Sequence, residues 1–550
     1  MTKTLVWFFL AALCVPAHAL AGSWAVGAGT GGIAALRAQL PNATTLVPGR
    51  ALLVRGARPT VRGAAYVENL AGESRPAAGK RRLAFVNTEP YANEQWYLPF
   101  DRAWDHWTDP PSLAPVRVAV IDTGIDYSHP EFAGRVAAGA SFVGGNWKRD
   151  TCGHGTFVAG EIAANPSNNL GIAGLAFNAR LLIAKVVDAQ CNVSTLGEID
   201  GIRWAVNHGA KIINLSLGGV RDPIDLGIDT YSAPEEAAVE YAYSRGVLVV
   251  AAVGNGTQGA PKTPWIYADY PAALPHVLGV SAVREDGGVP VYSNRDSQFN
   301  DIAAPGGPIF STIPRNLIDP SLANCADQPY SDCGPSEFQS GIGTSFAAPQ
   351  VTAAAALLLG QDPKLTPDQV EWLLERSATD ETATIGCVTC SVGRDSLTGW
   401  GRLDIDTALT LLGDGTRLPA ADAYEPNDDA GTAAHPFGIP RTISATLDYW
   451  DDPIDVYSIR LAKGEQLFAR LGRSTVAPTT LALWKPGTAH VEGSAADPAN
   501  RVTESRVVAG QVRLSYRAPA GGVYFIEAKA ESPSRSPDAY TLAVAISPAA

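Results

Sequence analysis

Five short apolar runs, rich in β-branched residues, alternate with helical patterns between about residues 87 and 412 of this 550-residue chain. Runs of this kind are typical of buried strands. Strands that alternate with helices predict an α/β fold, with a doubly wound, mostly parallel sheet and helices on both faces. The predicted strands are Val116–Ile121, Leu181–Val187, Ile212–Leu217, Val247–Val253 and Val277–Val283. The predicted helices are Gly155–Ala164, Leu196–His208, Pro234–Ser244, Ser345–Leu359 and Thr366–Arg376.

The sequence pattern changes after Leu412. Residues 413–424 form a polar linker, and residues 425–550 consist of short alternating segments separated by Gly, Pro and Asp turns. Segments of this kind predict a small, separate all-β sandwich. The clearest of them are Thr442–Leu447, Val456–Leu461, Gln466–Leu471 and Val523–Ala528.

The charge balance argues against two classes of partner. The chain has 42 basic and 55 acidic residues, which gives a net charge of −13. A protein this acidic is poorly suited to bind nucleic acid or an anionic membrane, so neither is expected as its main partner.

The N-terminus has the form of a secretory signal peptide. Lys3 precedes the apolar run Leu5–Pro16, and Ala17-His18-Ala19 has the small-x-small shape of a signal-peptidase site. We therefore expect residues 1–21 to be removed and the protein to be secreted, to the extracellular space or a periplasm. A membrane anchor is a weaker alternative because the apolar run is short for a bilayer, and we expect no stable membrane insertion. A lipoprotein signal at Cys14 is the other alternative, which the bulky Leu13 disfavours.

Removal of the signal peptide takes Cys14 and leaves six cysteines in a compartment where disulfides persist. Fifteen connectivities are possible. Proximity in sequence favours the pairs Cys325–Cys333 and Cys387–Cys390, with Cys152–Cys191 as the third. A Cys-x-x-Cys pair such as the second could also serve redox or zinc chemistry, although one isolated pair in a secreted chain favours a disulfide.

Three residues at the ends of predicted elements are candidates for nucleophilic catalysis. The chain contains neither H-E-x-x-H nor G-x-S-x-G, which argues against a zincin and against an α/β-hydrolase. Asp122 ends a predicted strand, His154 opens a helix between two glycines, and Ser345 begins another helix. A nucleophilic serine needs a base, and the base needs a carboxylate that fixes its tautomer.

Each of these three residues also has an ordinary explanation. An Asp after a strand is usually a turn residue, a Ser at a helix start is usually an N-cap, and a His between glycines is more often structural. Taken together, however, the three occur in Gly- and Thr-rich contexts at element ends, in the order Asp, His, Ser. The combination favours catalysis.

The segments around these residues resemble the three catalytic motifs of the subtilisin-like serine proteases, the subtilases. They are V-A-V-I-D-T-G-I-D at Val118–Asp126, G-H-G-T-F-V-A-G at Gly153–Gly160 and G-T-S-F-A-A-P at Gly343–Pro349. The resemblance covers about residues 87–412. It implies a serine endopeptidase in which Ser345 is the nucleophile, His154 the general base and Asp122 the residue that orients His154.

Two positions depart from the family pattern. Phe157 stands where subtilases usually have a second His, and Phe346 stands where Met commonly follows the nucleophile. Neither position carries out the chemistry, so the departures leave the expected activity in place.

The same resemblance extends to substrate recognition. Asn255, in V-A-A-V-G-N-G, corresponds to the residue that donates its side-chain amide to the oxyanion in subtilases. The family's substrate-binding segments correspond to Ser216, Leu217 and Gly218 on one side and to Ala252 and Gly254 on the other. Such a segment pairs with polypeptide substrates as an added strand.

Asp269 falls near the position where subtilases place the floor of the specificity pocket. A carboxylate there would favour Lys or Arg before the scissile bond, because opposite charges pair. The alternative is a solvated surface Asp with no part in specificity.

A structural calcium site is also implied by the resemblance. Glu89, Glu131 and the loop with Asn168, Leu170 and Ile172 resemble the acidic residues and the loop that hold Ca²⁺ in many subtilases. Calcium takes six to eight oxygen ligands, so carbonyl oxygens of the loop would complete the shell. Two glutamates stand where aspartates are more usual, and a plain turn with solvated acids is the alternative.

The flanking segments complete the expected precursor. Residues 22–86 occupy the place of a subtilase propeptide, an intramolecular folding assistant and inhibitor. Residues 425–550 resemble the bacterial pre-peptidase C-terminal (PPC) domain, through E-P-N-D at Glu425–Asp428 and D-V-Y at Asp455–Tyr457. We expect a monomer with catalytic domain 87–412. The competing hypothesis is a catalytically silent subtilase-like protein that binds polypeptide or a surface.

Overall fold

The structure is a computed structural model that divides into two compact units, residues 1–82 and 83–550. Residues 23–28, 32–47, 51–55 and 64–69 are described in the first unit. In the second unit the structure describes residues 87–548 except 110, 226, 257–264, 318–336, 417, 419–422, 426, 432–433, 439–440, 448–451, 474–478, 492–495, 509–510 and 532–537. The expected signal peptide and the pair Cys325–Cys333 lie outside the described residues.

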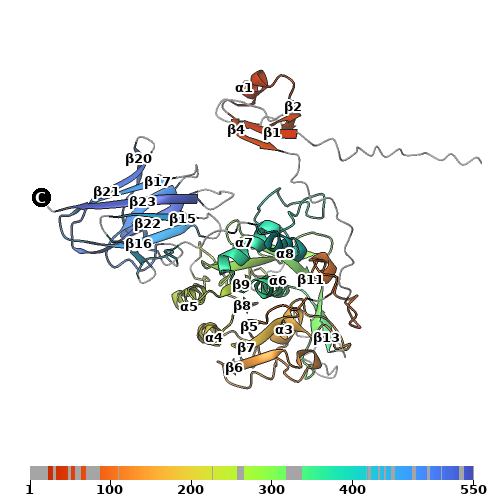
Figure 1. Cartoon of the computed structure of the whole chain (residues 1–550). Helices are drawn as coiled ribbons and strands as arrows, with labels where there is room; N and C mark the ends of the chain where they lie inside the picture. Colours follow the sequence, from red (N-terminus) through yellow and green to blue (C-terminus); the bar gives the residue numbers. More distant parts are fainter. Residues whose placement is uncertain are drawn as a thin grey trace, which may run out of the picture. The chain divides into compact units, whose positions relative to one another are not determined.

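The first unit contains one helix and a four-stranded antiparallel sheet of order β2-β3-β1-β4 (Figure 1). Leu36 of the helix and Leu52 of the sheet are both buried, so the helix packs on the sheet through an apolar contact layer. The elements are β1 (Ser23–Ala28), α1 (Gly32–Gln39), β2 (Thr44–Val47), β3 (Ala51–Arg55) and β4 (Ala64–Asn69).

The second unit is built on a seven-stranded sheet of order β11-β10-β9-β8-β5-β7-β6, in which every pairing is parallel. Its strands are β5 (Val116–Asp122), β6 (Val136–Ser141), β7 (Ala179–Lys185), β8 (Ile212–Leu215), β9 (Leu248–Ala252), β10 (Val277–Arg284) and β11 (Ile302–Gly307). The five strands expected from the apolar runs are all present, and the expected α/β architecture is confirmed.

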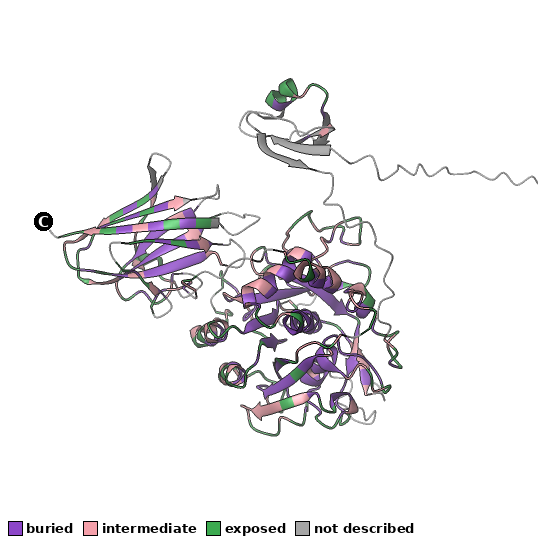
Figure 2. Cartoon of the chain, in the orientation of Figure 1, coloured by how far each residue is buried: buried purple, intermediate pink, exposed green. Residues whose placement is uncertain are grey.

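Helices cover both faces of this sheet. Successive side chains of a strand point to opposite faces, and β5 divides its side chains accordingly. Val118 and Val120 belong to the core with α3 and α6, whereas Ala119 and Ile121 belong to the core with α4 and α5. The strands of the central sheet are largely buried (Figure 2). The helices are α2 (Tyr97–Phe100), α3 (His154–Ala163), α4 (Thr195–Asn207), α5 (Ala233–Tyr243), α6 (Ala348–Gln361), α7 (Pro367–Ser377) and α8 (Ile405–Gly413).

Two helix starts are informative. Helix α7 begins as expected, with Thr366 as N-cap in a capping box with Gln369. Helix α6 begins at Ala348 and not at Ser345, because Ser345 lies in the preceding 3₁₀ turn η4 (Thr344–Phe346). Pro349 favours the first turn of an α-helix, which accounts for the later start.

Smaller features complete this part of the chain. Strands β12 (Ile309–Thr312) and β13 (Phe338–Gly341) form a separate antiparallel pair. The disulfides Cys152–Cys191 and Cys387–Cys390 are both present. Within the described residues, no helix combines the length and the apolar character that crossing a membrane requires.

The chain after residue 430 forms two five-stranded sheets, of order β14-β16-β22-β18-β19 and β15-β23-β17-β21-β20. Tyr457, Leu467 and Leu542 lie in the apolar core that these strands share. The strands are β14 (His435–Pro436), β15 (Arg441–Leu447), β16 (Ile454–Leu461), β17 (Gln466–Arg473), β18 (Thr479–Trp484), β19 (Arg501–Glu504), β20 (Arg506–Val508), β21 (Gln511–Arg517), β22 (Gly522–Ala530) and β23 (Asp538–Ser547).

Candidate active site

The candidate residues gather at the carboxyl ends of three neighbouring strands. Strand β8 lies between β9 and β5 in the central sheet. Asp122 is the last residue of β5, Ser216 directly follows β8, and Asn255 lies three residues after the end of β9. The carboxyl edge of a parallel sheet is where open α/β folds place their sites, so the topology brings residues distant in sequence to one edge.

Asp122 and His154 form a hydrogen-bonded pair at this edge. The Nδ1 atom of His154 lies 2.9 Å from each carboxylate oxygen of Asp122. Asp122 is 1% exposed, and its Oδ1 also accepts a 2.7 Å hydrogen bond from the Thr123 backbone N–H. A carboxylate at Nδ1 holds that nitrogen as the donor and leaves Nε2 of His154 as the basic nitrogen.

The pair changes the proton affinity of His154. Burial disfavours the charged imidazole, but the charge of Asp122 and its hydrogen bond outweigh burial, so the pKa of His154 is raised above its ordinary value. A raised pKa makes His154 a stronger base for a proton taken from a neighbouring hydroxyl.

The turn before α3 is held by Asp150, a fully buried acid that sequence reasoning did not single out. Its Oδ1 accepts hydrogen bonds from the N–H groups of Cys152 (3.0 Å) and Gly153 (2.7 Å), and its Oδ2 accepts from Thr156 N (2.9 Å) and Thr156 Oγ1 (2.7 Å). These bonds satisfy donors at the N-terminus of α3 and fix the backbone that carries His154. An acid a few residues before a helix start was the available signal.

Ser345 lies in η4, at the entry to α6. The hydroxyl of Ser216 donates a 2.7 Å hydrogen bond to the carbonyl oxygen of Ser345, which ties the segment after β8 to this turn. The next residue, Phe346, packs its ring 5.5 Å from the ring of His154 and 4.2 Å from that of Phe157. The two departures from the family pattern are therefore in contact with each other beside the candidate base.

The side chain of Asn255 has a defined orientation. Its Oδ1 accepts hydrogen bonds from the backbone N–H of Thr344 (2.9 Å) and from the Thr344 hydroxyl (3.0 Å). Because Oδ1 accepts from two donors, the opposite placement of the amide oxygen and nitrogen would point the amide NH₂ group at the N–H and the hydroxyl of Thr344. Nδ2 of Asn255 is thereby kept as a donor beside η4. Thr344, which sets this orientation, was missed by sequence reasoning.

The expected substrate segments are joined through the residues around Asp269. Gly219 and Tyr270 exchange backbone hydrogen bonds of 2.9 and 2.8 Å, and Asp269 N donates to Val253 O at 2.9 Å. A Cβ atom on Gly254 would lie 2.1 Å from Oδ2 of Asp269, so the carboxylate touches the segment after β9. The structure thus brings Ser216, Leu217, Gly218, Ala252, Gly254 and Asp269 together.

Asp269 is not a solvated surface acid, since it is only 9% exposed. Burial raises the pKa of Asp269 to about 8, against the opposing hydrogen bonds from the Arg221 backbone and the Asn294 side chain. Its Oδ1 has no hydrogen-bond partner among the described residues. A buried oxygen of this kind is costly unless a ligand supplies a donor.

The five residues expected to bind calcium also lie together, but their polarity does not fit a cation. Glu89 accepts hydrogen bonds from the backbone N–H groups of Asn169 and Leu170, both at 3.0 Å. Glu131 accepts from Ile172 N (3.2 Å) and Asn168 Nδ2 (2.9 Å). The loop therefore turns its N–H groups, not its carbonyl oxygens, toward both carboxylates, and a cation at the same place would face donors.

The two glutamates are buried, with exposed fractions of 4% for Glu89 and 0% for Glu131. The pKa of Glu131 is raised to about 7, mainly by burial. The hydrogen bonds from Asn168 and Ile172 oppose this rise, and the charge of Glu89 adds to it. In this arrangement the N–H groups of the loop are bound by the carboxylate of Glu89.

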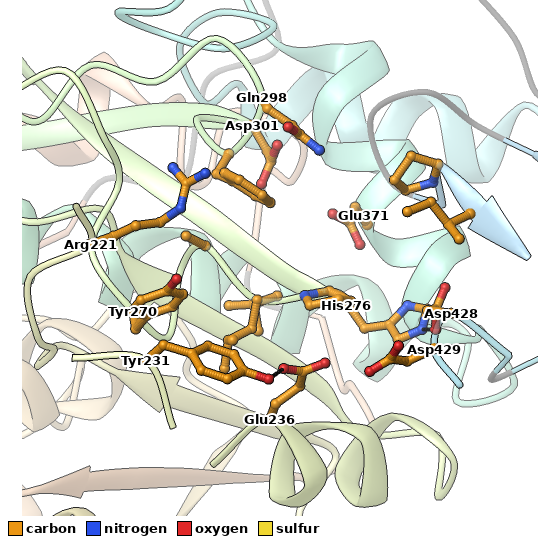
Figure 3. A pocket seen from close by; sticks show the side chains of 17 residues that line it. Arg221, Tyr231, Glu236, Tyr270, His276, Gln298, Asp301, Glu371, Asp428 and Asp429 are labelled. Carbon is orange, nitrogen blue, oxygen red and sulfur yellow. Dashed lines mark hydrogen bonds and ion pairs between the residues drawn. The ribbon is translucent and has the colours of Figure 1, made fainter. Parts of the chain in front are cut away.

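A pocket of about 160 Å³ is lined in part by Tyr270, the residue after Asp269 (Figure 3). Its wall includes Tyr231 and Glu236, which share a hydrogen bond, and His276, whose Nε2 lies 2.6 Å from Oδ2 of Asp428. Neither Asp122, His154 nor Ser345 lines this pocket. It is therefore distinct from the candidate catalytic centre.

Comparisons with known proteins identify the family. A model of the subtilase family matches residues 114–401. Subtilisin DY from Bacillus licheniformis is 35% identical over 269 residues, which are 48% of this chain and 85% of that protein. Subtilisin E from Bacillus subtilis is 37% identical over 267 residues, covering 48% and 60%, and fervidolysin from Fervidobacterium pennivorans is 32% identical over 336 residues, covering 58% and 44%.

Among solved structures, a lanthipeptide protease matches with 24% identity and a TM-score of 0.47, over 58% of this chain and 94% of that one. The family match and the subtilisin relatives define a serine endopeptidase. The chain belongs to the subtilase family.

The pair Asp122–His154 predicts a specific pH profile. A general base acts in its neutral form, so kcat/KM for a peptide should rise with pH through an apparent pKa above about 6.5, the ordinary value for His. Asp122→Asn removes the charge that raises this pKa. We expect the limb to move to lower pH and the plateau to fall by about 10⁴-fold.

The matched control is Asp200→Asn on α4, which removes a partly exposed acid that pairs with Arg203. It should leave both the limb and the plateau unchanged. An acid limb that does not move in Asp122→Asn would show that another group sets the profile.

The loop at Glu89 predicts a second measurable effect. Glu89→Gln removes the charge and turns an amide N–H₂ toward backbone donors, so it should lower the free energy of unfolding by about 2–3 kcal/mol. The measurement is denaturant unfolding in the Ser345→Ala background, with EDTA and with added calcium. Because Glu89 is bonded to N–H groups, we expect the same loss in both conditions.

Glu94→Gln is the matched control, because Glu94 is an exposed acid nearby. If Glu89 were instead a calcium ligand, chelation and substitution would remove one shared interaction, and their effects would not add. A loss from Glu89→Gln that vanishes in EDTA would contradict our assignment.

Proposed function

We propose that this chain is a secreted serine endopeptidase that cleaves polypeptides with an Asp122–His154–Ser345 triad and an Asn255-assisted oxyanion hole. The observation that carries the proposal is the pair of the buried Asp122 and the half-buried His154, joined at 2.9 Å beside the turn that contains Ser345. The orientation of Asn255 by Thr344, next to Ser345 in the chain, supports it further.

Each residue has a defined role in the proposed reaction. His154 Nε2 takes the proton of the Ser345 hydroxyl as Oγ attacks the scissile carbonyl carbon, and it later gives that proton to the leaving amine. Asp122 orients the imidazole and stabilises the imidazolium. The Nδ2 amide of Asn255 and the Ser345 backbone N–H donate to the oxyanion.

Substrate binding follows from the two segments that Tyr270 and Asp269 join. The segment 216–218 follows strand β8 and pairs with the substrate backbone as an added strand, while Ala252 and Gly254 form the opposite side of the pocket. Asp269 lies against Gly254. We propose that it faces the side chain that precedes the scissile bond.

The domain assignment is part of the proposal. Residues 1–21 are a signal peptide, residues 22–86 a propeptide that inhibits the enzyme until its removal, and residues 87–412 the catalytic domain. The four-stranded sheet of the first unit supports a propeptide that folds by itself. After the linker 413–424, residues 425–550 form a PPC-like sandwich, which the two five-stranded sheets support. The mature enzyme acts as a monomer.

A fluorophosphonate probe tests the catalytic assignment, because it reacts with a serine that a neighbouring base activates. We expect mature wild-type protein to be labelled at Ser345 only, as located by peptide mass spectrometry. Asn255→Ala should reduce kcat by about 10²–10³, the magnitude typical of this family's own oxyanion donor.

Ser345→Ala is the negative control and should take up no probe. If correctly processed protein stayed unlabelled, the result would contradict the peptidase assignment. It would support the alternative, a catalytically silent protein that binds polypeptide or a surface.

Asp269 predicts selectivity for Lys or Arg before the scissile bond. An ion pair in a buried pocket contributes about 1.5–3 kcal/mol, so kcat/KM should favour Arg over Leu peptides by about 10–100-fold. Because the pKa of Asp269 is about 8 before substrate binds, the preference should increase as pH rises through that value. Asp269→Asn should abolish it.

The control is Asp225→Asn, which removes an exposed acid and should leave selectivity unchanged. A preference of the wild-type enzyme for Phe would contradict the role of Asp269 without affecting the catalytic assignment.

A further inference from the structure

Three potential metal ligands from distant parts of the chain meet beside helix α5. Glu240 lies on α5, His276 directly precedes β10, and Asp428 lies in the segment that leads to the sandwich. One ligand atom from each residue lies within 4.8 Å of the other two. Nε2 of His276 is 2.6 Å from Oδ2 of Asp428 and 3.9 Å from Oε2 of Glu240. Figure 3 shows the imidazole of His276 pointing toward Asp428.

These three groups are shielded from solvent, and one of them lacks hydrogen bonds. The side chains of His276 and Asp428 are 4% and 9% exposed. Both carboxylate oxygens of Glu240 are buried, and neither has a hydrogen-bond partner among the described residues. The 3.9 Å approach of Glu240 to His276 is too long for a hydrogen bond. A buried carboxylate without hydrogen bonds is costly, so this arrangement favours a further positive partner.

The neighbouring acids are satisfied within the chain. Glu236, one turn earlier on α5, accepts a hydrogen bond from the Tyr231 hydroxyl. Asp429 accepts two backbone N–H hydrogen bonds of 2.7 Å, and its other oxygen lies 2.7 Å from Nδ1 of His490. The carboxylate of Glu240 therefore differs from those around it, although it lies on the same helix as Glu236.

The imidazole of His276 is held in a fixed orientation. Its ring stacks on that of Tyr243, with ring centroids 3.6 Å apart and planes 2° from parallel. The hydroxyl of Tyr243 in turn donates a 2.8 Å hydrogen bond to Asp368 on α7. A ligand whose orientation is set in advance loses little conformational freedom on binding.

We propose that Glu240, His276 and Asp428 bind a zinc ion. One imidazole nitrogen with two carboxylate oxygens is a ligand set that suits Zn²⁺, whereas Ca²⁺ and Mg²⁺ prefer oxygen ligands alone. With a neutral imidazole, the two carboxylates balance the charge of one divalent ion.

The observed spacing is compatible with this ion. At Zn²⁺–ligand bonds of about 2.0–2.1 Å, the ligand atoms of a tetrahedral shell stand about 3.3 Å apart. The distances from Nε2 of His276 to Asp428 and to Glu240, 2.6 and 3.9 Å, lie on either side of that value. Side-chain shifts of less than about 1 Å would bring both into range.

The site also has a route of entry. Glu240 and Asp428 both line a hollow of about 560 Å³, which leaves room for a water molecule as the fourth ligand. Because its ligands come from α5, from the start of β10 and from the segment before β14, the ion would tie the sandwich to the central part of the same unit. The proposal is independent of the peptidase function, since the catalytic proposal uses none of these three residues.

The test measures Zn²⁺ binding by isothermal titration calorimetry of the full chain with Ser345→Ala, which does not digest itself. The protein is freed of metal by chelation and then kept in excess Ca²⁺. The calcium occupies all-oxygen sites, including any at the separate carboxylate cluster of Glu425, Asp452 and Asp455.

We expect one Zn²⁺ per chain whose binding depends on the three ligands. Glu240→Gln and His276→Gln should each weaken it by at least about tenfold, because the loss of an outer contact of a metal ligand already costs about 10–100-fold. Zn²⁺ should also raise the midpoint of thermal unfolding, and Glu240→Gln should lose this rise.

The matched control is Glu236→Gln, which removes one negative charge from the same helix and keeps an acceptor for Tyr231. It should weaken Zn²⁺ binding only slightly. Equal losses in Glu236→Gln and Glu240→Gln would overturn the proposal, because a general negative field would then explain the binding. No Zn²⁺ binding, or binding that Glu240→Gln and His276→Gln leave unchanged, would overturn it as well.

A second titration, with Ca²⁺ alone, tests the choice of metal. Ca²⁺ binding that Glu240→Gln weakens as strongly as it weakens Zn²⁺ binding would overturn the assignment to zinc. Unfolding curves of the metal-free variants distinguish the loss of a ligand from the loss of the fold.

Discussion

The buried carboxylate of Asp122 is the constraint on which the rest of the site depends. A charge at the end of a buried strand is tolerated only when hydrogen bonds and an opposite dipole or charge compensate it. Thr123 N–H and His154 Nδ1 supply that compensation, so the start of α3 is held against the end of β5. Asp150 then fixes the turn on the other side of His154. The contacts that compensate the buried charge of Asp122 therefore also position His154, the proposed base.

Much of this arrangement could be predicted from sequence, because parallel topology has few solutions. The apolar run that ends at Asp122 placed this residue at the carboxyl end of a predicted strand, whereas Ser216 and Asn255 were identified by the resemblance to subtilases. The orientation of Asn255 by Thr344, and the contact of Phe157 with Phe346, could not be predicted in the same way. They depend on how η4 turns before α6, which is a matter of tertiary packing and not of local pattern.

The loop at Glu89 shows a different limit. The resemblance to subtilases predicted a calcium site at these residues, and the structure brings Glu89, Glu131 and the loop together. Residue types, however, do not encode whether a loop turns its N–H groups or its carbonyl oxygens inward. Here the N–H groups of Asn169 and Leu170 face Glu89, so a carboxylate occupies the place where a cation was expected. The same residue types are therefore compatible with a loop that holds a cation through its carbonyl oxygens and with a loop that binds a carboxylate through its N–H groups.

Burial has different consequences for Asp122 and Asp269. The carboxylate of Asp122 is compensated by the Thr123 N–H and by His154 Nδ1. Asp269 Oδ1 has no hydrogen-bond partner among the described residues, and burial raises the pKa of Asp269 to about 8. Under the proposed function, the effect of Asp269 is confined to a side chain that enters the pocket, where solvent and salt screen little.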